Sequence, residues 1–233
     1  MKRILIVGAF ALLAGGQALA ADLPPPVAPP PRAPAVYVPV AQVFSWTGIY
    51  LGINGGGAYG RSSWADPSPL FPPTGTFAFD GYLVGGTVGG NYQIGSFVIG
   101  LEGDGDWSHL SGTTFNISCV VVGCQTKSDW LATVRGRAGW AWDRVMFYGT
   151  GGAAFANVQA AAGAFPFSSS TQAGWVAGAG IEYAFMPNWT AKVEYLFVDL
   201  GNQPCSPVNC SGTATNVSLN ESIIRGGVNF KFW

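Results

Sequence analysis

The chain has 233 residues, of which 10% are charged and 14% are aromatic, and it contains 34 glycines. Soluble domains have roughly 25% charged residues, so a chain with so few cannot cover a water-facing surface with charge. Its net charge of −1 also lacks the basic excess that a nucleic-acid partner requires, so no such partner is expected.

The first segment has the layout of a secretory signal peptide. Lys2 and Arg3 precede an apolar run over residues 4–13, and small residues lead to a cleavage site before Ala21. A run of about ten apolar residues is too short to span a membrane as a helix. The sequence therefore predicts export and removal of residues 1–20.

Residues 21–45 form a proline-rich stretch. Such sequences are extended and semi-rigid. We expect a periplasmic arm, which either acts as a spacer that contacts peptidoglycan or a partner, or is simply a disordered leader.

Eight segments of alternating apolar and polar residues follow, as in strands that bury one face. No apolar run of 18 or more residues occurs after the leader, which excludes helical spans. The fifth segment is rich in Gly and Ala and does not reveal its orientation. The segments are 46–59, 81–93, 97–107, 127–140, 145–157, 172–185, 189–199 and 225–233.

The connections between these segments alternate in length. Short ones lie at 94–96, 142–144 and 186–188. Long ones lie around 61–77, 108–127, 157–172 and 200–219. Short periplasmic turns and long outer loops are typical of outer-membrane barrels. The sequence predicts an all-β fold: an eight-stranded antiparallel transmembrane β-barrel over residues 46–233.

The alternation alone does not say which face is inside, because a soluble barrel would show it with the apolar face inward. Glycines gather on the polar face, where they would make room for long neighbours inside a narrow barrel: Gly48, Gly52, Gly85, Gly89, Gly100, Gly174, Gly178, Gly180 and Gly227. Aromatic residues lie near the segment ends, where membrane girdles belong: Trp46, Tyr92, Trp107, Trp130, Trp140, Tyr183, Phe185 and Trp189. Together with the sparse charge, these patterns favour a lipid-facing apolar surface.

The C-terminal stretch resembles the assembly signal of bacterial outer-membrane barrels. The pattern is a polar residue, a glycine two positions on, and two apolar residues near the end. Arg225, Gly227, Phe230 and Phe232 occupy these places, and Trp233 follows one residue past the usual terminal aromatic.

Several motifs together resemble one family. They are Trp46/Gly48/Tyr50/Gly52, Gly100/Glu102/Asp104, Trp130 with Arg135/Gly136/Arg137/Gly139, Tyr148/Gly151/Gly152, Gly174/Trp175/Gly178/Gly180/Glu182/Tyr183 and Glu194/Tyr195. With them, residues 46–233 are similar to the 25 and 31 kDa outer-membrane immunogenic proteins of alphaproteobacteria. The resemblance implies an eight-stranded barrel of the small surface-protein superfamily, often labelled porin-family. It further implies roles in envelope integrity and host interaction, and no catalytic residues.

Charged residues on the polar face are balanced in number. They are Glu102, Asp104, Asp106, Glu182 and Glu194 against Arg135, Arg137, Lys192, Arg225 and Lys231. Either they line a charged pore or they form a salt-bridged plug. The plug is favoured because side chains fill eight-stranded barrels.

Few residues suggest catalysis or metal binding. Asp104 and Asp106 lack the further oxygen ligands that calcium requires. His109 lies near Ser108 and Ser111, which raises the hypothesis of a hydrolase, but no third triad member or oxyanion hole is evident. The sequence therefore predicts no enzyme, no metal and no cofactor.

Four cysteines form two closely spaced pairs, Cys119 with Cys124 and Cys205 with Cys210. In an oxidising compartment they should form disulfides, for which three connectivities fit. A metal site built from all four is the alternative, although neither pair is a Cys-x-x-Cys.

We expect an integral protein of the bacterial outer membrane that supports envelope integrity and surface or host interaction through its outer loops. The alternatives are a narrow, low-conductance porin and a barrel enzyme acting on lipid or peptide. Expected partners are outer-membrane lipids and lipopolysaccharide, the barrel assembly machinery through the C-terminal strand, and peptidoglycan or a host surface.

Overall fold

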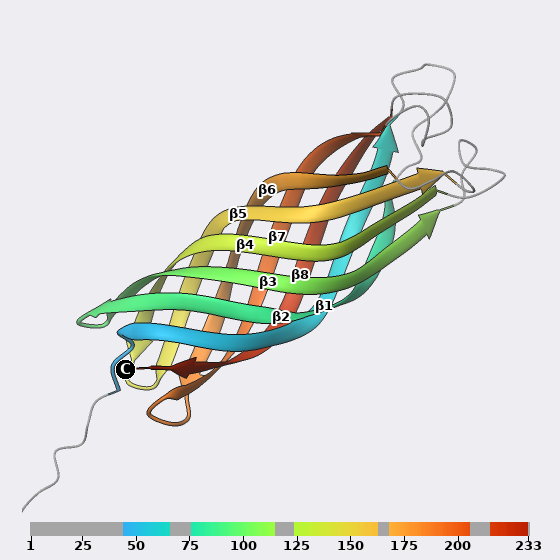
Figure 1. Ribbon diagram of the computed structural model, residues 1–233. Coiled ribbons are helices and arrows are strands. Elements are labelled where there is room, and N and C mark those ends of the chain that lie inside the picture. Colours follow the sequence, from blue (N-terminus) through green and yellow to red (C-terminus); the bar gives the residue numbers. More distant parts are fainter. Residues whose placement is uncertain (1–43, 66–75, 115–123, 163–167, 206–214, 233) are drawn as a thin grey trace, which may run out of the picture. The chain divides into compact units, whose positions relative to one another are not determined.

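The computed structural model describes residues 44–65, 76–114, 124–162, 168–205 and 215–232. They form a closed barrel of eight antiparallel strands, in which each strand pairs with the next and the last with the first (Figure 1). The strands are β1 (Gly48–Ala65), β2 (Thr76–Ile94), β3 (Phe97–Thr114), β4 (Cys124–Trp142), β5 (Val145–Ala162), β6 (Ser168–Ala184), β7 (Trp189–Cys205) and β8 (Thr215–Lys231). The predicted fold class is confirmed. None of these residues belongs to a helix long and apolar enough to cross a membrane.

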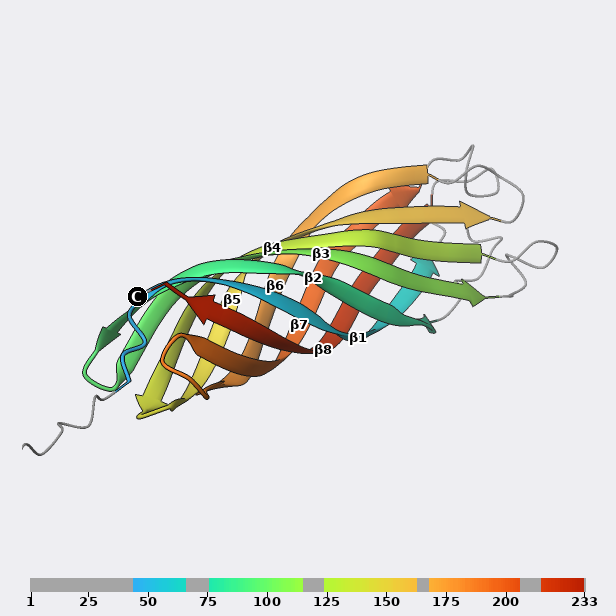
Figure 2. The same cartoon turned by 60° about the horizontal axis from the view of Figure 1, so that its bottom comes forward.

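The strands are longer than the alternating segments of the sequence. Each runs for 17 to 19 residues, and the strands run obliquely around the barrel (Figure 2). β3 continues past residue 107 to Thr114, and β4 begins at Cys124 instead of residue 127. The long connections are therefore shorter than predicted, whereas the short turns lie where they were expected.

The outer surface of the barrel carries an apolar band between two girdles of aromatic residues. Ile53 and Leu101 lie in this band, 71% and 70% exposed. Aromatic residues near the short turns are Tyr92, Phe97, Trp140, Trp142, Tyr183, Phe185 and Trp189. Those toward the long connections are Tyr59, Tyr82, Trp107, Trp130, Phe155 and Trp175. This is the outer surface of a barrel embedded in lipid, with a girdle at each interface.

Beyond the aromatic girdle nearer the long connections, the inner and outer faces of the barrel exchange polarity. Inward positions become apolar, as at Phe79 and Leu219, while outward positions become polar and exposed, as at Asp80 and Asn220. The part of β3 after Trp107 extends roughly 20 Å, at ~3.3 Å per residue. An apolar inside with a polar outside suits water, so this end of the barrel protrudes from the hydrocarbon layer.

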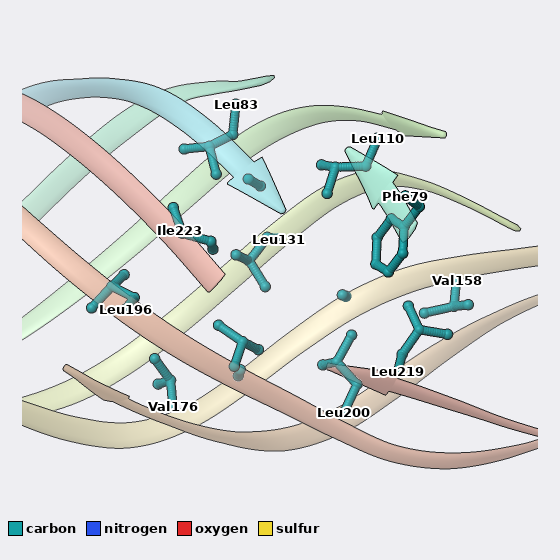
Figure 3. Packing of buried hydrophobic residues seen from close by; sticks show 14 residues of the cluster. Phe79, Leu83, Leu110, Leu131, Val158, Val176, Leu196, Leu200, Leu219 and Ile223 are labelled. Atoms are coloured by element: carbon teal, nitrogen blue, oxygen red, sulfur yellow. The ribbon is translucent and has the colours of Figure 1, made fainter. Parts of the chain in front are cut away.

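Side chains inside the barrel form three layers. The first, at the short-turn end, is an apolar cluster of Phe44, Trp46, Val98, Ala141, Met146, Tyr148 and Ala184. The middle layer is charged. The third layer, toward the long connections, is a second apolar cluster whose side chains converge from many strands (Figure 3). Its larger members are Phe79, Leu83, Leu110, Leu131, Val158, Val176, Leu196, Leu200, Leu219 and Ile223.

Several predictions fall outside the described residues. These are the signal peptide at 1–20, the arm up to residue 43, and Trp233. Cys119 and Cys210 also lie outside, and Cys124 and Cys205 are described only as the ends of β4 and β7. The disulfides therefore stay a prediction.

Candidate functional site: an ionic network inside the barrel

The middle layer of the lumen is a network of ion pairs that joins five of the strands. It holds nine of the ten inward charges predicted from the alternation, and all nine are buried. They are Glu102, Asp104 and Asp106 from β3, Arg135 and Arg137 from β4, Glu182 from β6, Lys192 and Glu194 from β7, and Arg225 from β8.

Arg135 lies at the centre of this network. Its Nη2 contacts Glu102 Oε1 and lies 2.6 Å from Asp104 Oδ2, while its Nη1 lies 3.1 Å from Glu194 Oε2. One side chain of β4 thus binds both neighbouring β3 and β7 on the far side of the lumen. A planar guanidinium can make these contacts at the same time because its donors point in several directions.

Arg225 makes a second three-way contact from β8. Its guanidinium lies 2.9 Å from Asp104 Oδ1, 2.7 Å from Asp106 Oδ2 and 2.7 Å from Glu194 Oε1. Asp104 and Glu194 are therefore each shared with Arg135, so the two arginines and their carboxylates form one connected unit.

Arg137 and Lys192 extend the unit toward the short turns. Lys192 Nζ lies 2.9 Å from Glu102 Oε2. Arg137 pairs with Glu182 Oε2 at 2.6 Å, and its guanidinium carbon lies 4.0 Å from the centre of the Tyr148 ring. The aromatic face adds a cation–π contact to the ion pair.

Neutral side chains complete the hydrogen bonding of the carboxylates, and sequence reasoning singled out only Tyr50 among them, as part of a family motif. The Tyr50 hydroxyl donates to Glu102 Oε2 at 2.7 Å, and the Thr133 hydroxyl donates to Asp104 Oδ2 at 2.8 Å. Thr87 Oγ1 donates to Asp104 Oδ1 at 2.8 Å, and the Asn229 amide donates to Glu182 Oε1 at 3.0 Å. All occupy inward positions, so the same alternation that identified the charges also marks them.

The inward glycines leave room for the long side chains of this layer. A Cβ at Gly180 would lie 2.6 Å from the Tyr148 ring, and one at Gly89 would collide with the ring of Tyr50. The interpretation of the glycine-rich face as an interior face is thereby confirmed. The middle of the lumen is occupied by paired charges and aromatic rings.

This architecture matches a known family over most of the chain. The family model described as "Outer membrane protein beta-barrel domain" matches residues 33–232. The chain belongs to this family. A 31 kDa outer-membrane immunogenic protein of Brucella melitensis is 37% identical over 250 residues, covering 100% of both chains. A 25 kDa outer-membrane immunogenic protein of Brucella abortus is 29% identical, covering 100% of this chain and 99% of its own.

Among solved structures, the outer membrane protease OmpT of Escherichia coli aligns with a TM-score of 0.50 and 11% identity, covering 82% of this chain and 99% of that chain. This likeness concerns the fold alone. The resemblance to the 25 and 31 kDa immunogenic proteins and the outer-membrane localisation are both confirmed by the family match and the curated relatives.

One of the ten inward charges predicted from the sequence does not belong to the ionic network. Lys231 faces inward, but its ammonium donates to the Ser45 carbonyl oxygen and lies 4.3 Å from the centre of the Phe44 ring. It lies at the end of β8, in the short-turn mouth, where the chain entering β1 offers it a carbonyl and an aromatic ring instead of a carboxylate.

Trp46 also departs from its expected place in an aromatic girdle. It is only 2% exposed and lies inside the short-turn mouth. Its backbone N–H donates to Gln93 Oε1 at 2.7 Å, and its indole Nε1 donates to the Asp143 carbonyl oxygen at 3.1 Å. The segment before β1 therefore closes this end of the barrel.

One further buried carboxylate lies outside the network. Glu221 faces inward from β8 between Leu219 and Ile223 of the apolar layer. Its Oε1 has no hydrogen-bond partner, and no ion pair involves it among the described residues. The alternation of β8 identifies it, but only once the strand is extended upstream of residue 225.

The candidate catalytic residues are not assembled into a site. His109 is exposed on the outer surface, with its ring 5.7 Å from that of Tyr82. Ser108 points into the barrel and donates to the Ser128 carbonyl oxygen at 3.1 Å. His109 and Ser108 thus lie on opposite faces of β3. Within the described ranges, no three His, Cys, Asp or Glu residues are grouped as metal ligands.

The residues of the assembly signal divide between the two faces of β8. Arg225 is buried in the network, whereas Phe232 is exposed on the lipid side. The Phe230 ring lies edge-on to those of Trp189 and Phe232, with centroid separations of 5.1 and 5.3 Å. An aromatic patch therefore lies where β8 ends.

Proposed function

We propose that this chain is a closed outer-membrane barrel that strengthens the envelope and presents its protruding end for contacts outside the cell. The observation that carries the proposal is the ionic network across the lumen. Nine buried charges are each paired within the barrel, whereas Glu221 and Lys231 lie apart from them in the outer apolar layer and the short-turn mouth. Within the described residues, the lumen therefore lacks the continuous lining of unpaired charges that an aqueous pore uses.

The layers above and below the network support the same conclusion. Trp46 and Phe44 lie in the short-turn mouth, and an apolar cluster lies on the opposite side of the charges. Hydrated solutes would have to cross two apolar layers and break ion pairs between them. A stabilising, non-conducting role explains this construction better than a porin does.

The protruding end supports a role in surface contacts. β6 and β7 pair from Ala184 and Thr190 up to Trp175 and Asp199, and their described residues beyond that point are not paired with each other. Gly201, with φ of +68°, lies in β7 just past the last pair. An unpaired strand edge can accept an extended segment of another protein.

Three further contacts belong to the proposal. The lipid-facing surface meets outer-membrane lipids and lipopolysaccharide, the barrel assembly machinery recognises β8, and the proline-rich arm reaches toward peptidoglycan. Short turns normally face the periplasm, so the proposal has the protruding end outside the cell.

A complementation experiment tests the function. Deletion of the gene in the source bacterium should raise sensitivity to detergents and to large antibiotics that the outer membrane normally excludes. The intact chain should restore both the barrier and attachment to host cells. A folded variant with residues 206–214 replaced by a short Gly-Ser turn should restore only the barrier.

Two results would reject the proposal. Slower uptake of small solutes in the deletion strain, with an unchanged barrier, would favour the porin. Turnover of lipid A or of a peptide that His109→Ala abolishes would favour a barrel enzyme.

A further inference from the structure

A groove of about 780 Å³ crosses the lipid-facing side of β4 to β7, in the half of the barrel near the short turns. Its lining includes one row of small outward residues. Ala138 pairs with Gly149, and Gly149 pairs with Ala179, so the three lie side by side across neighbouring strands. A Cβ at Gly149 would meet nothing closer than 3.9 Å, which shows that the row is open.

Large side chains border this row on the side of the short turns. Trp140 pairs with Phe147, and Phe147 pairs with Ile181, in register with the small row and two residues along each strand. All three also line the groove. Rows two residues apart are separated by roughly 7 Å along a strand, so the large side chains form a wall directly beside the small row.

The groove faces hydrocarbon, and this limits what can occupy it. An occupant must be apolar, because unsatisfied polar groups are costly in lipid. An unfilled groove would deprive its lining of dispersion contacts. An acyl chain satisfies both conditions and is present in the surrounding membrane.

Charge at the adjacent turn indicates which lipid the acyl chain belongs to. Of the three short turns, the one between β4 and β5 is the only one with charged residues, Asp143 and Arg144. The Arg144 carbonyl oxygen accepts a hydrogen bond from the Ala184 N–H at 2.8 Å, so this turn lies beside the end of β6.

Arg144 is half-buried, and within the described residues its guanidinium has no ion-pair partner. Guanidinium groups bind phosphate with two parallel hydrogen bonds. The turn therefore supplies a positive group at the membrane surface, next to the strands that carry Trp140 and Phe147. The neighbouring Asp143 partly offsets this positive charge.

We propose that the groove retains one glycerophospholipid of the periplasmic leaflet. An acyl chain lies along Ala138, Gly149 and Ala179, and Arg144 holds the phosphate. The leaflet follows from the position of the groove near the short turns, which face the periplasm in this class of barrel.

Native mass spectrometry of the full barrel tests the proposal. The purified chain in mild detergent is stripped of lipid and titrated with dioleoyl phosphatidylglycerol. The wild-type barrel should take up one lipid before any others bind. Gly149→Leu, which places a side chain in the open row, should weaken this first binding by roughly tenfold, equivalent to ~1.4 kcal/mol.

Matched variants control for folding and for general lipid adhesion. Gly105→Leu adds the same side chain at an outward glycine of β3, where nothing lies within 4 Å, and should bind like wild type. Arg144→Gln should weaken the first binding without abolishing it. Heat-modifiable gel mobility establishes that each barrel is folded, and Ala179→Leu replaces Gly149→Leu if the latter fails to fold.

Other outcomes would overturn the proposal. If the wild type, Gly149→Leu and Ala179→Leu all bind the first lipid equally well, the lipid adheres elsewhere. If one detergent molecule is retained in the same way without added phospholipid, the groove holds an adventitious additive only. A dimer that Gly149→Leu disrupts, without a lipid adduct in the wild-type spectrum, would show that a second copy of the chain covers the groove.

Discussion

Replacement of Arg135 by leucine tests the ionic network at its centre. The change removes the guanidinium that contacts Glu102, Asp104 and Glu194. Removal of one partner from a buried ion pair typically costs ~3–5 kcal/mol, because the other charge is left uncompensated.

The remaining contacts place the expected loss at the lower end of this range. Asp104 and Glu194 keep Arg225 at 2.9 and 2.7 Å, and Glu102 keeps Lys192 at 2.9 Å. No carboxylate becomes isolated, but five carboxylates would then share three cations. We therefore expect Arg135→Leu to lower the free energy of unfolding by about 3 kcal/mol.

Equilibrium urea unfolding in lipid vesicles, followed by tryptophan fluorescence, measures this loss, and heat-modifiable mobility reports the folded fraction independently. Arg61→Leu is a matched control, because Arg61 is exposed on the outside of β1 and has no part in the network. A midpoint for Arg135→Leu as close to wild type as that of Arg61→Leu would refute the account of the network.

Three further changes probe other parts of the barrel. Glu221→Leu should raise the free energy of unfolding by ~1–3 kcal/mol, because it removes a buried carboxylate without a partner, and a loss of stability in the same urea assay would contradict this. Phe232→Asp should leave the chain unassembled in the periplasm, because a carboxylate on the lipid face costs up to a few kcal/mol. Asn220→Asp, at an exposed outward position in the polar outer part of β8, should assemble normally, and equal heat-modifiability of the two variants would count against the predicted orientation. Replacement of Cys119 and Cys124 by serine should cost about 2 kcal/mol or less and leave a folded barrel, because the closed ring is short. Non-reducing peptide mapping should find these two cysteines joined, and a link to the β7–β8 connection would show a clamp between loops instead.

The alternation of the sequence predicted the strands and the charged interior because both depend on local position. Each network residue occupies the same phase of its strand as the inward glycines, so Arg135 and Glu194 are recognisable without knowledge of the register. Their pairing is not, because it depends on how eight strands align around the barrel.

The outer ends of the strands could not be predicted because the polarity of the alternation reverses there. At Phe79 and Leu219 the apolar residue faces inward, as in a soluble barrel, whereas at Leu101 it faces lipid. A pattern that keeps its period but changes its polarity resembles a loop. The hypotheses of a membrane barrel and of a water-exposed barrel thus describe different parts of the same strands.

Trp46 and Lys231 were misassigned for a related reason. Both lie at the short-turn mouth, where the chain before β1 folds across the opening and supplies the carbonyl of Ser45 and the ring of Phe44. This contact joins residues far apart in the sequence, and no local pattern indicates it.

The central claim is that the lumen is closed, and single-channel recording in planar bilayers tests it most directly. The purified wild-type barrel, shown to be folded by its heat-modifiable mobility, should give no unitary conductance steps under conditions in which a general porin conducts. Reproducible steps from the wild-type barrel, rising with salt concentration, would contradict the account and identify the chain as a narrow porin.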